Sequence, residues 1–141
     1  MRINKKKFIY LISPNKISKR FYYNLKLLLK TGKIKYFQLR LKKYSLNNKI
    51  LIGRKIKNIC NKNKVKFLVN DDPQLALRLC ADGCHLGQKD MNIFEARKMI
   101  GSKIIGITCN NSIKLAKKAT INKANYIAIG AFNFSKTKRV K

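Results

Sequence analysis

Six short apolar runs alternate with five amphipathic segments along this chain, and this alternation limits its fold more than any other feature. The runs are rich in β-branched and aromatic residues and read as strands, at residues 8–12, 36–40, 65–69, 83–86, 104–108 and 126–130. The segments between them carry apolar residues at helical spacing. They comprise a helix built on Phe21, Leu25 and Leu28 and four further helices at residues 48–60, 74–79, 92–100 and 112–119. Strands that alternate with helices predict an α/β protein with a parallel sheet.

The natural closed form of such a pattern is the (β/α)8 TIM barrel, which usually takes about 250 residues. The 141 residues provide six strands. We therefore expect residues 1–141 to form a single (β/α) barrel domain that is incomplete, truncated after the sixth strand with the last two βα units missing. An unclosed barrel exposes the edges of its first and last strands. Three explanations stay open: a truncated gene, a separately encoded C-terminal part, or self-association that covers the gap.

The composition is strongly basic, with 34 Lys and Arg against 5 acidic residues and a net charge of +29. The lysines are spread over the whole length and accompany many Asn and Ile, as an AT-rich genome produces. We therefore expect no specific nucleic-acid partner, although a basic surface binds polyanions weakly. No apolar stretch approaches the length of a membrane span, so we expect no membrane partner and a cytoplasmic location. Four cysteines without a second ligand pair favour buried reduced thiols over a zinc site.

The scarce acidic residues are concentrated in one stretch, and they are Asp71, Asp72, Asp82, Asp90 and Glu95. Asp72 precedes a proline and is typical of a helix N-cap, and Glu95 completes a capping box with Asn92. Asp82 lies before a glycine in a predicted turn. Only Asp71 and Asp90 have no such capping role.

Asp71 and Asp90 follow two successive predicted strands, each just before a helix. All such turns of a parallel sheet share the face at the carboxyl ends of the strands, where ligands bind. Carboxylate oxygens from neighbouring turns suit Mg²⁺ when a substrate phosphate and water supply its other ligands. The pair is therefore a candidate magnesium site.

A polar row marks the end of the second strand, where Gln38, Arg40 and Lys42 alternate with apolar residues. If this row points inward, Arg40 can make a planar bidentate contact with a diphosphate, and Lys42 can supply a point charge. The alternative is a solvent-facing basic strand end.

Four segments in this order resemble the thiamine-phosphate synthase family. They read Gln38-Leu39-Arg40-Leu41-Lys42, Asn70-Asp71-Asp72-Pro73-Gln74-Leu75-Ala76, Ala81-Asp82-Gly83-Cys84-His85-Leu86-Gly87-Gln88-Lys89-Asp90 and Lys136-Thr137-Lys138. The resemblance runs through the whole chain. It implies a transferase that joins 4-amino-2-methyl-5-(diphosphooxymethyl)pyrimidine to 4-methyl-5-(2-phosphooxyethyl)thiazole, giving thiamine phosphate and diphosphate in thiamine biosynthesis.

The resemblance also implies a role for each matching residue. Those expected to bind the pyrimidine diphosphate are Gln38, Leu39, Arg40, Leu41, Lys42, Asn70, Thr108 and Lys138. Those expected to bind the thiazole phosphate are Ser135, Lys136 and Thr137, and the Mg²⁺ ligands are Asp71 and Asp90. Arg40, Lys42 and Lys138 are the expected catalytic charges. Thr108 stands where the family has Ser, and Ser135 where it has Thr.

Two alternatives remain beside the synthase. The related thiazole tautomerase uses a histidine shortly after the fifth strand, where this chain has Asn110. A truncated, non-catalytic remnant would bind phosphate compounds or nucleic acid by charge alone. The single histidine, His85, is expected to be an oriented, hydrogen-bonded interior residue.

Overall fold

The computed structural model describes residues 7–130 and residue 132. Strands and helices alternate through this part of the chain. The strands are β1 (Ile9–Ile12), β2 (Ile34–Leu39), β3 (Lys66–Asn70), β4 (Gly83–Leu86), β5 (Ile104–Asn110) and β6 (Tyr126–Ile129). The helices are α1 (Lys19–Lys30), α2 (Leu46–Lys62), α3 (Pro73–Arg78), α4 (Ile93–Ile100) and α5 (Ile113–Ile121).

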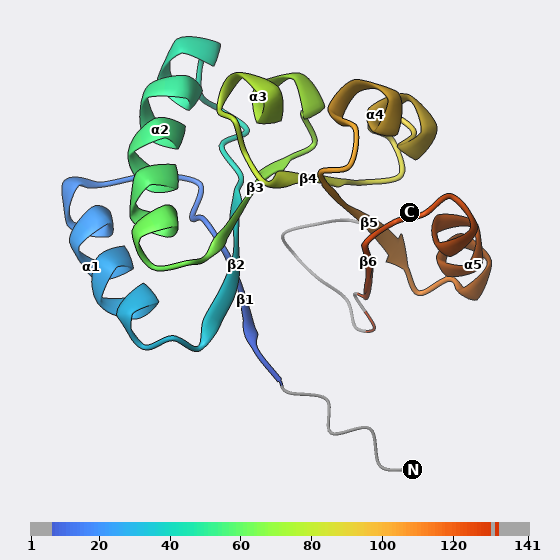
Figure 1. Ribbon diagram of the computed structural model, residues 1–141, viewed down its shortest axis with the longest axis horizontal. Helices are drawn as coiled ribbons and strands as arrows, with labels where there is room; N and C mark the ends of the chain where they lie inside the picture. Colours follow the sequence, from blue (N-terminus) through green and yellow to red (C-terminus); the bar gives the residue numbers. More distant parts are fainter. Residues whose placement is uncertain (1–6, 131, 133–141) are drawn as a thin grey trace.

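The six strands form one parallel sheet in chain order, β1-β2-β3-β4-β5-β6. Figure 1 shows this sheet as an arc with the five helices around its convex side. The α/β class and the parallel sheet are thus confirmed. Within the described residues the sheet is a six-stranded half-barrel, open between β1 and β6, and it differs here from a closed eight-stranded barrel. That residues 1–141 form one domain stays a prediction.

The main core lies between the convex face of the sheet and the helices. Phe37 of β2 and Phe67 of β3 are neighbours in register, fully buried and stacked with ring centroids 6.3 Å apart. The same core includes Leu25, Leu29, Ile56, Leu75, Ala96 and Ile105. Burial of these apolar surfaces fixes each helix on the sheet and leaves the strand ends free to carry polar residues.

The predicted N-cap residues of α3 and α4 are confirmed. The side chain of Asp72 accepts a hydrogen bond from the Leu75 N–H at 2.9 Å, and Asn92 accepts one from the Glu95 N–H at 3.0 Å. Asp82 lies at the opposite end of the sheet from Asp71, where it accepts hydrogen bonds from Phe67 N and Lys66 Nζ. The bounds of several elements differ from the predicted ones by one or two residues, because helix ends and strand ends depend on these local contacts.

The cysteines of the described chain are unpaired thiols, with Cys60, Cys84 and Cys109 buried and Cys80 exposed. Burial raises the pKa of Cys60 and of Cys84 to about 12, so both stay protonated at neutral pH. Residues 7–130 contain no helix that is both long enough and apolar enough to cross a bilayer.

Candidate functional site

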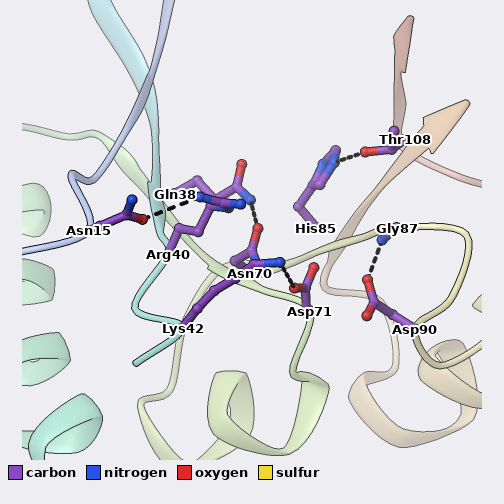
Figure 2. A network of polar contacts seen from close by, with 10 residues as sticks. All are labelled: Asn15, Gln38, Arg40, Lys42, Asn70, Asp71, His85, Gly87, Asp90 and Thr108. Carbon is purple, nitrogen blue, oxygen red and sulfur yellow. Dashed lines mark hydrogen bonds and ion pairs between the residues drawn. The ribbon is translucent and has the colours of Figure 1, made fainter. Parts of the chain in front are cut away.

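Gln38 lies near the carboxyl end of β2 and points into the concave side of the sheet. Its side chain is only 3% exposed. Its amide nitrogen donates to Asn70 Oδ1 of β3 at 2.5 Å, and its amide oxygen accepts from the Tyr10 hydroxyl at 3.1 Å. Figure 2 shows Gln38 and Asn70 side by side at this face. Of the two orientations that the sequence left open for the polar row, the inward one is confirmed for Gln38.

Arg40 follows β2 and is held by the loop after β1. Its backbone N–H donates to Ser13 Oγ at 2.8 Å, and its guanidinium donates to Asn15 Oδ1 at 3.4 Å (Figure 2). The contact between the guanidinium and Asn15 is long, and the other N–H groups of the guanidinium are available to an anion. Lys42 Nζ lies 3.8 Å from Asp71 Oδ2, with more than half of its side chain exposed.

Leu39 and Leu41 were also expected to contact the pyrimidine diphosphate. Their side chains are 2% and 5% exposed and belong to the hydrophobic core. Their side chains therefore stabilise the strand end that carries Gln38 and Arg40. Both residues also line the groove beside Asp71, and their contact with the pyrimidine diphosphate stays a prediction.

Asp71 and Asp90 approach each other across the turns that follow β3 and β4 (Figure 2). Asp71 has a positive φ of 64°, a backbone conformation that a non-glycine residue adopts at some cost. Its backbone N–H is fixed by the His85 carbonyl at 2.8 Å, and its carboxylate accepts a hydrogen bond from the Asn70 side chain. Asp90 Oδ2 accepts from the Gly87 N–H at 2.6 Å, which closes the turn after β4.

This acid pair has an energetic consequence. Burial raises the pKa of the Asp71 carboxyl above its usual value of 3.8, and the nearby Asp90 raises it further, while Lys42 and Asn70 lower it to a smaller extent. Two facing carboxylates with one distant lysine carry uncompensated negative charge in a chain of net charge +29. The oxygen donors therefore fit a divalent cation that takes two carboxylates and completes its shell with phosphate and water.

Replacing Asp71 with asparagine should raise stability at neutral pH in the presence of a chelator. The folded state binds the Asp71 proton more tightly than the unfolded state, so its contribution to stability falls as pH rises from the usual pKa through the raised one. Thermal denaturation of both proteins at pH 7 and pH 3 should show the variant more stable at pH 7. The difference should shrink at pH 3, where Asp71 is protonated. Equal thermal unfolding midpoints of the two proteins at pH 7 would contradict the repulsion between the Asp71 and Asp90 carboxylates.

A groove of about 640 Å³ opens beside this pair, at the carboxyl ends of β2 and β3. Its walls include Lys42, Lys49, Asn70, Asp71 and Met91. Cations and carboxylates thus meet in one concave surface, where ligands of parallel sheets bind.

Thr108 of β5 faces the same concave side. Its hydroxyl lies 2.8 Å from His85 Nε2, and its carbonyl accepts a hydrogen bond from the Gln88 side chain in the turn after β4. His85 is 8% exposed, and its other ring nitrogen lies 2.8 Å from the Tyr126 hydroxyl. The expectation of an oriented, hydrogen-bonded interior histidine is confirmed.

The structure brings together most of the predicted site. Gln38, Arg40 and Lys42 gather with Asn70 and Asp71 at one end of the sheet, with Asp90 across the next turn (Figure 2). Ser135, Lys136, Thr137 and Lys138 lie outside the described residues. Their expected contacts with the thiazole phosphate and the diphosphate stay predictions.

Sequence reasoning missed four residues that shape this site, namely Tyr10, Ser13, Gln88 and Tyr126. Ser13 and Gln88 each follow a strand at the carboxyl end of the sheet, and that position alone marks them as candidates. The tyrosines belong to predicted strands, but their hydroxyl contacts depend on the curvature of the sheet.

Comparison with known proteins identifies the family. The family model described as thiamine monophosphate synthase matches residues 9–141. The chain belongs to the thiamine monophosphate synthase family. It is 62% identical over 144 residues to a thiamine-phosphate synthase of Pelagibacter ubique, covering 100% of this chain and 70% of the relative. It is 40% identical over 108 residues to that of Marinobacter nauticus, covering 76% of this chain and 49% of the relative.

A solved structure has a similar fold over most of this chain. Thiamine phosphate pyrophosphorylase from Pyrococcus furiosus superposes with a TM-score of 0.79 at 28% identity, over 91% of this chain and 61% of that one. The chain thus spans between about half and about 70% of the length of these relatives. The matched part contains the strand ends that carry Gln38, Asn70 and Asp71.

Proposed function

We propose that this chain acts in thiamine-phosphate synthesis and that its described part forms the pyrimidine-diphosphate side of the site. The observation that carries the proposal is the facing pair Asp71 and Asp90 beside Lys42 and Arg40. Negative and positive groups arranged in this way suit a diphosphate bound together with a divalent cation. The substrate pair is the one that the resemblance to the family implies, and the family match supports it.

The reaction breaks the bond between the pyrimidine methylene carbon and the diphosphate oxygen, and it forms a bond from that carbon to the thiazole nitrogen. The leaving diphosphate gains negative charge, which Arg40, Lys42 and Lys138 would neutralise. Asp71 and Asp90 would hold Mg²⁺, which would supply further positive charge to the leaving diphosphate. Gln38, Asn70 and Thr108 would orient the pyrimidine ring. This chemistry needs no protein nucleophile.

The tautomerase alternative stays less supported. Asn110 ends β5 with a positive φ of 50°, at the place where that enzyme would need its histidine. An amide cannot transfer a proton as an imidazole does. The proposal includes a cytoplasmic location, where cysteines without a disulfide partner, as in the described chain, are usual.

The test is binding and turnover of the pyrimidine diphosphate. Calorimetry with purified chain 1–141 should show binding that needs Mg²⁺ and disappears with a chelator. Thiamine phosphate should form when both substrates are supplied to the chain extended by the C-terminal part of the Pelagibacter relative. A remnant that binds by charge alone would bind equally without Mg²⁺ and would form no product with or without the extension, which would overturn the proposal.

A further inference from the structure

The concave face of the sheet carries a continuous chain of hydrogen bonds to which every strand contributes one side chain. In order, its members are Thr108, His85, Tyr126, Tyr10, Gln38, Asn70 and Asp71, the last lying directly after β3. We call this set the hydrogen-bond chain. It joins the two sides of the proposed pyrimidine site, from Thr108 on β5 to Asp71 beside the groove.

Its central link connects the two edge strands. The hydroxyls of Tyr10 in β1 and Tyr126 in β6 lie 2.7 Å apart, although the residues are 116 positions apart in sequence. The Tyr126 ring lies directly over Gly106 of β5, where an added Cβ would meet ring atoms at 2.0 Å. It also stacks on the His85 ring, with centroids 5.5 Å apart. Packing thus fixes the Tyr126 hydroxyl between Tyr10 and His85.

The direction of the hydrogen bonds follows from the geometry at Asn70. Its amide nitrogen is turned toward Asp71 and its amide oxygen toward Gln38 (Figure 2). Asn70 Oδ1 then accepts from the Gln38 NH₂ group, which leaves Gln38 Oε1 to accept from the Tyr10 hydroxyl. Each amide thus accepts a hydrogen bond on the side of Tyr10 and donates one on the side of Asp71.

Each remaining hydrogen bond of the hydrogen-bond chain can then have only one donor. The single hydrogen of Tyr10 goes to Gln38, so Tyr126 donates to Tyr10 and His85 Nδ1–H donates to Tyr126. In a neutral imidazole, His85 Nε2 is then an acceptor, and the Thr108 hydroxyl donates to it. Burial raises the pKa of Tyr10 to about 12 and that of Tyr126 further, so both phenols keep their hydrogen at neutral pH.

This direction determines what the site offers a ligand. The Thr108 hydrogen is committed to His85, so its oxygen is left as an acceptor. Gln38 has its oxygen committed to Tyr10 and one amide hydrogen committed to Asn70, so it is left with an N–H donor. An aminopyrimidine carries both complements, an exocyclic NH₂ donor and ring-nitrogen acceptors.

We propose that Tyr10 and Tyr126 are positioning residues that hold the hydrogen-bond chain in one direction, so that Thr108 presents an acceptor and Gln38 a donor to an aminopyrimidine. The ligand class rests on the proposed function, whereas the direction of the hydrogen-bond chain does not. Reversing the direction would turn both side-chain amides around, would place the His85 hydrogen on Nε2, and would turn Thr108 into a donor. The tautomer of His85 therefore reports the direction.

His85 is the only histidine of the protein, so ¹⁵N-histidine labelling of chain 1–141 gives the spectrum of one ring. At neutral pH, two-bond ¹H–¹⁵N correlation spectra should show a protonated Nδ1 and an unprotonated Nε2. A ring protonated on Nε2, or on both nitrogens, would overturn the proposal. This measurement needs neither a variant nor a substrate.

Tyr126→Phe and Tyr10→Phe each remove one hydroxyl and keep the ring. In both variants the spectrum should no longer show the Nδ1–H pattern, that is, a His85 ring protonated on Nδ1 and not on Nε2. Both should also bind the pyrimidine diphosphate about tenfold more weakly, the equivalent of one hydrogen bond. Tyr36→Phe is the matched control. Its ring packs 5.7 Å from Tyr10 and 6.0 Å from Tyr126, but its hydroxyl is not part of the hydrogen-bond chain, so the Nδ1–H pattern should persist.

Persistence of the Nδ1–H pattern in both Tyr126→Phe and Tyr10→Phe would overturn the positioning role. An Nδ1–H ring that depends on both tyrosines, in a protein that binds no pyrimidine diphosphate, would support the direction and refute the ligand class with the proposed function. An Nε2–H ring in a protein that does bind this substrate would refute the direction alone.

Discussion

Replacing Asp71 with alanine is expected to weaken Mg²⁺-dependent binding of the pyrimidine diphosphate about a hundredfold or more, the scale typical for loss of a charged group in a metal or anion site. The variant loses one of two facing carboxylates and the partner of both Asn70 and Lys42. Calorimetric titrations with and without Mg²⁺ measure the effect. The residual affinity should equal that of the wild-type protein in chelator.

Glu95→Gln is the matched control for this variant. It removes one of the five negative charges, so it changes the net charge equally, but Glu95 is exposed on α4 and serves the helix N-terminus through its backbone. It should bind the substrate as the wild-type protein does. If both variants lose affinity to the same extent, general charge controls binding and the Asp71–Asp90 pair is not a specific cation site.

Gly83→Ala is expected to have the largest effect on stability. A Cβ at Gly83 of β4 would lie 1.9 Å from the carbonyl oxygen of Ile104 in β5, and a backbone atom inside a sheet cannot move aside. We expect a loss of about 3 kcal/mol or more, out of the roughly 5–15 kcal/mol that stabilises a typical domain. Urea denaturation followed by circular dichroism gives the free energy of unfolding.

Gly32→Ala separates this steric effect from backbone conformation. Gly32 follows α1 with a positive φ of 69°, and an added Cβ there meets open space. Only the left-handed conformation opposes alanine, at a cost of about 1 kcal/mol. A Gly83→Ala protein no less stable than Gly32→Ala would show that β4 and β5 can separate locally.

The sequence by itself determined the order of the elements and the ends of the strands where the site lies. Alternating apolar runs and helical spacing are local patterns, and so are the caps at Asp72 and Asn92, which left Asp71 and Asp90 as the acidic residues without such a task. Alternation within β2 placed Gln38 on the side of the strand opposite Phe37 and Leu39. These features depend on residues a few positions apart, so a reading of the chain can find them.

The tertiary structure alone decided which inward side chains meet. Tyr10 and Tyr126 come together because the sheet curls until its first and last strands face each other across the concave side, and neither residue carries a local mark of this contact. His85 likewise takes its partners from β5 and β6. Curvature is a collective result of strand twist and helix packing along the whole sheet, so contacts that depend on it cannot be derived from any single segment.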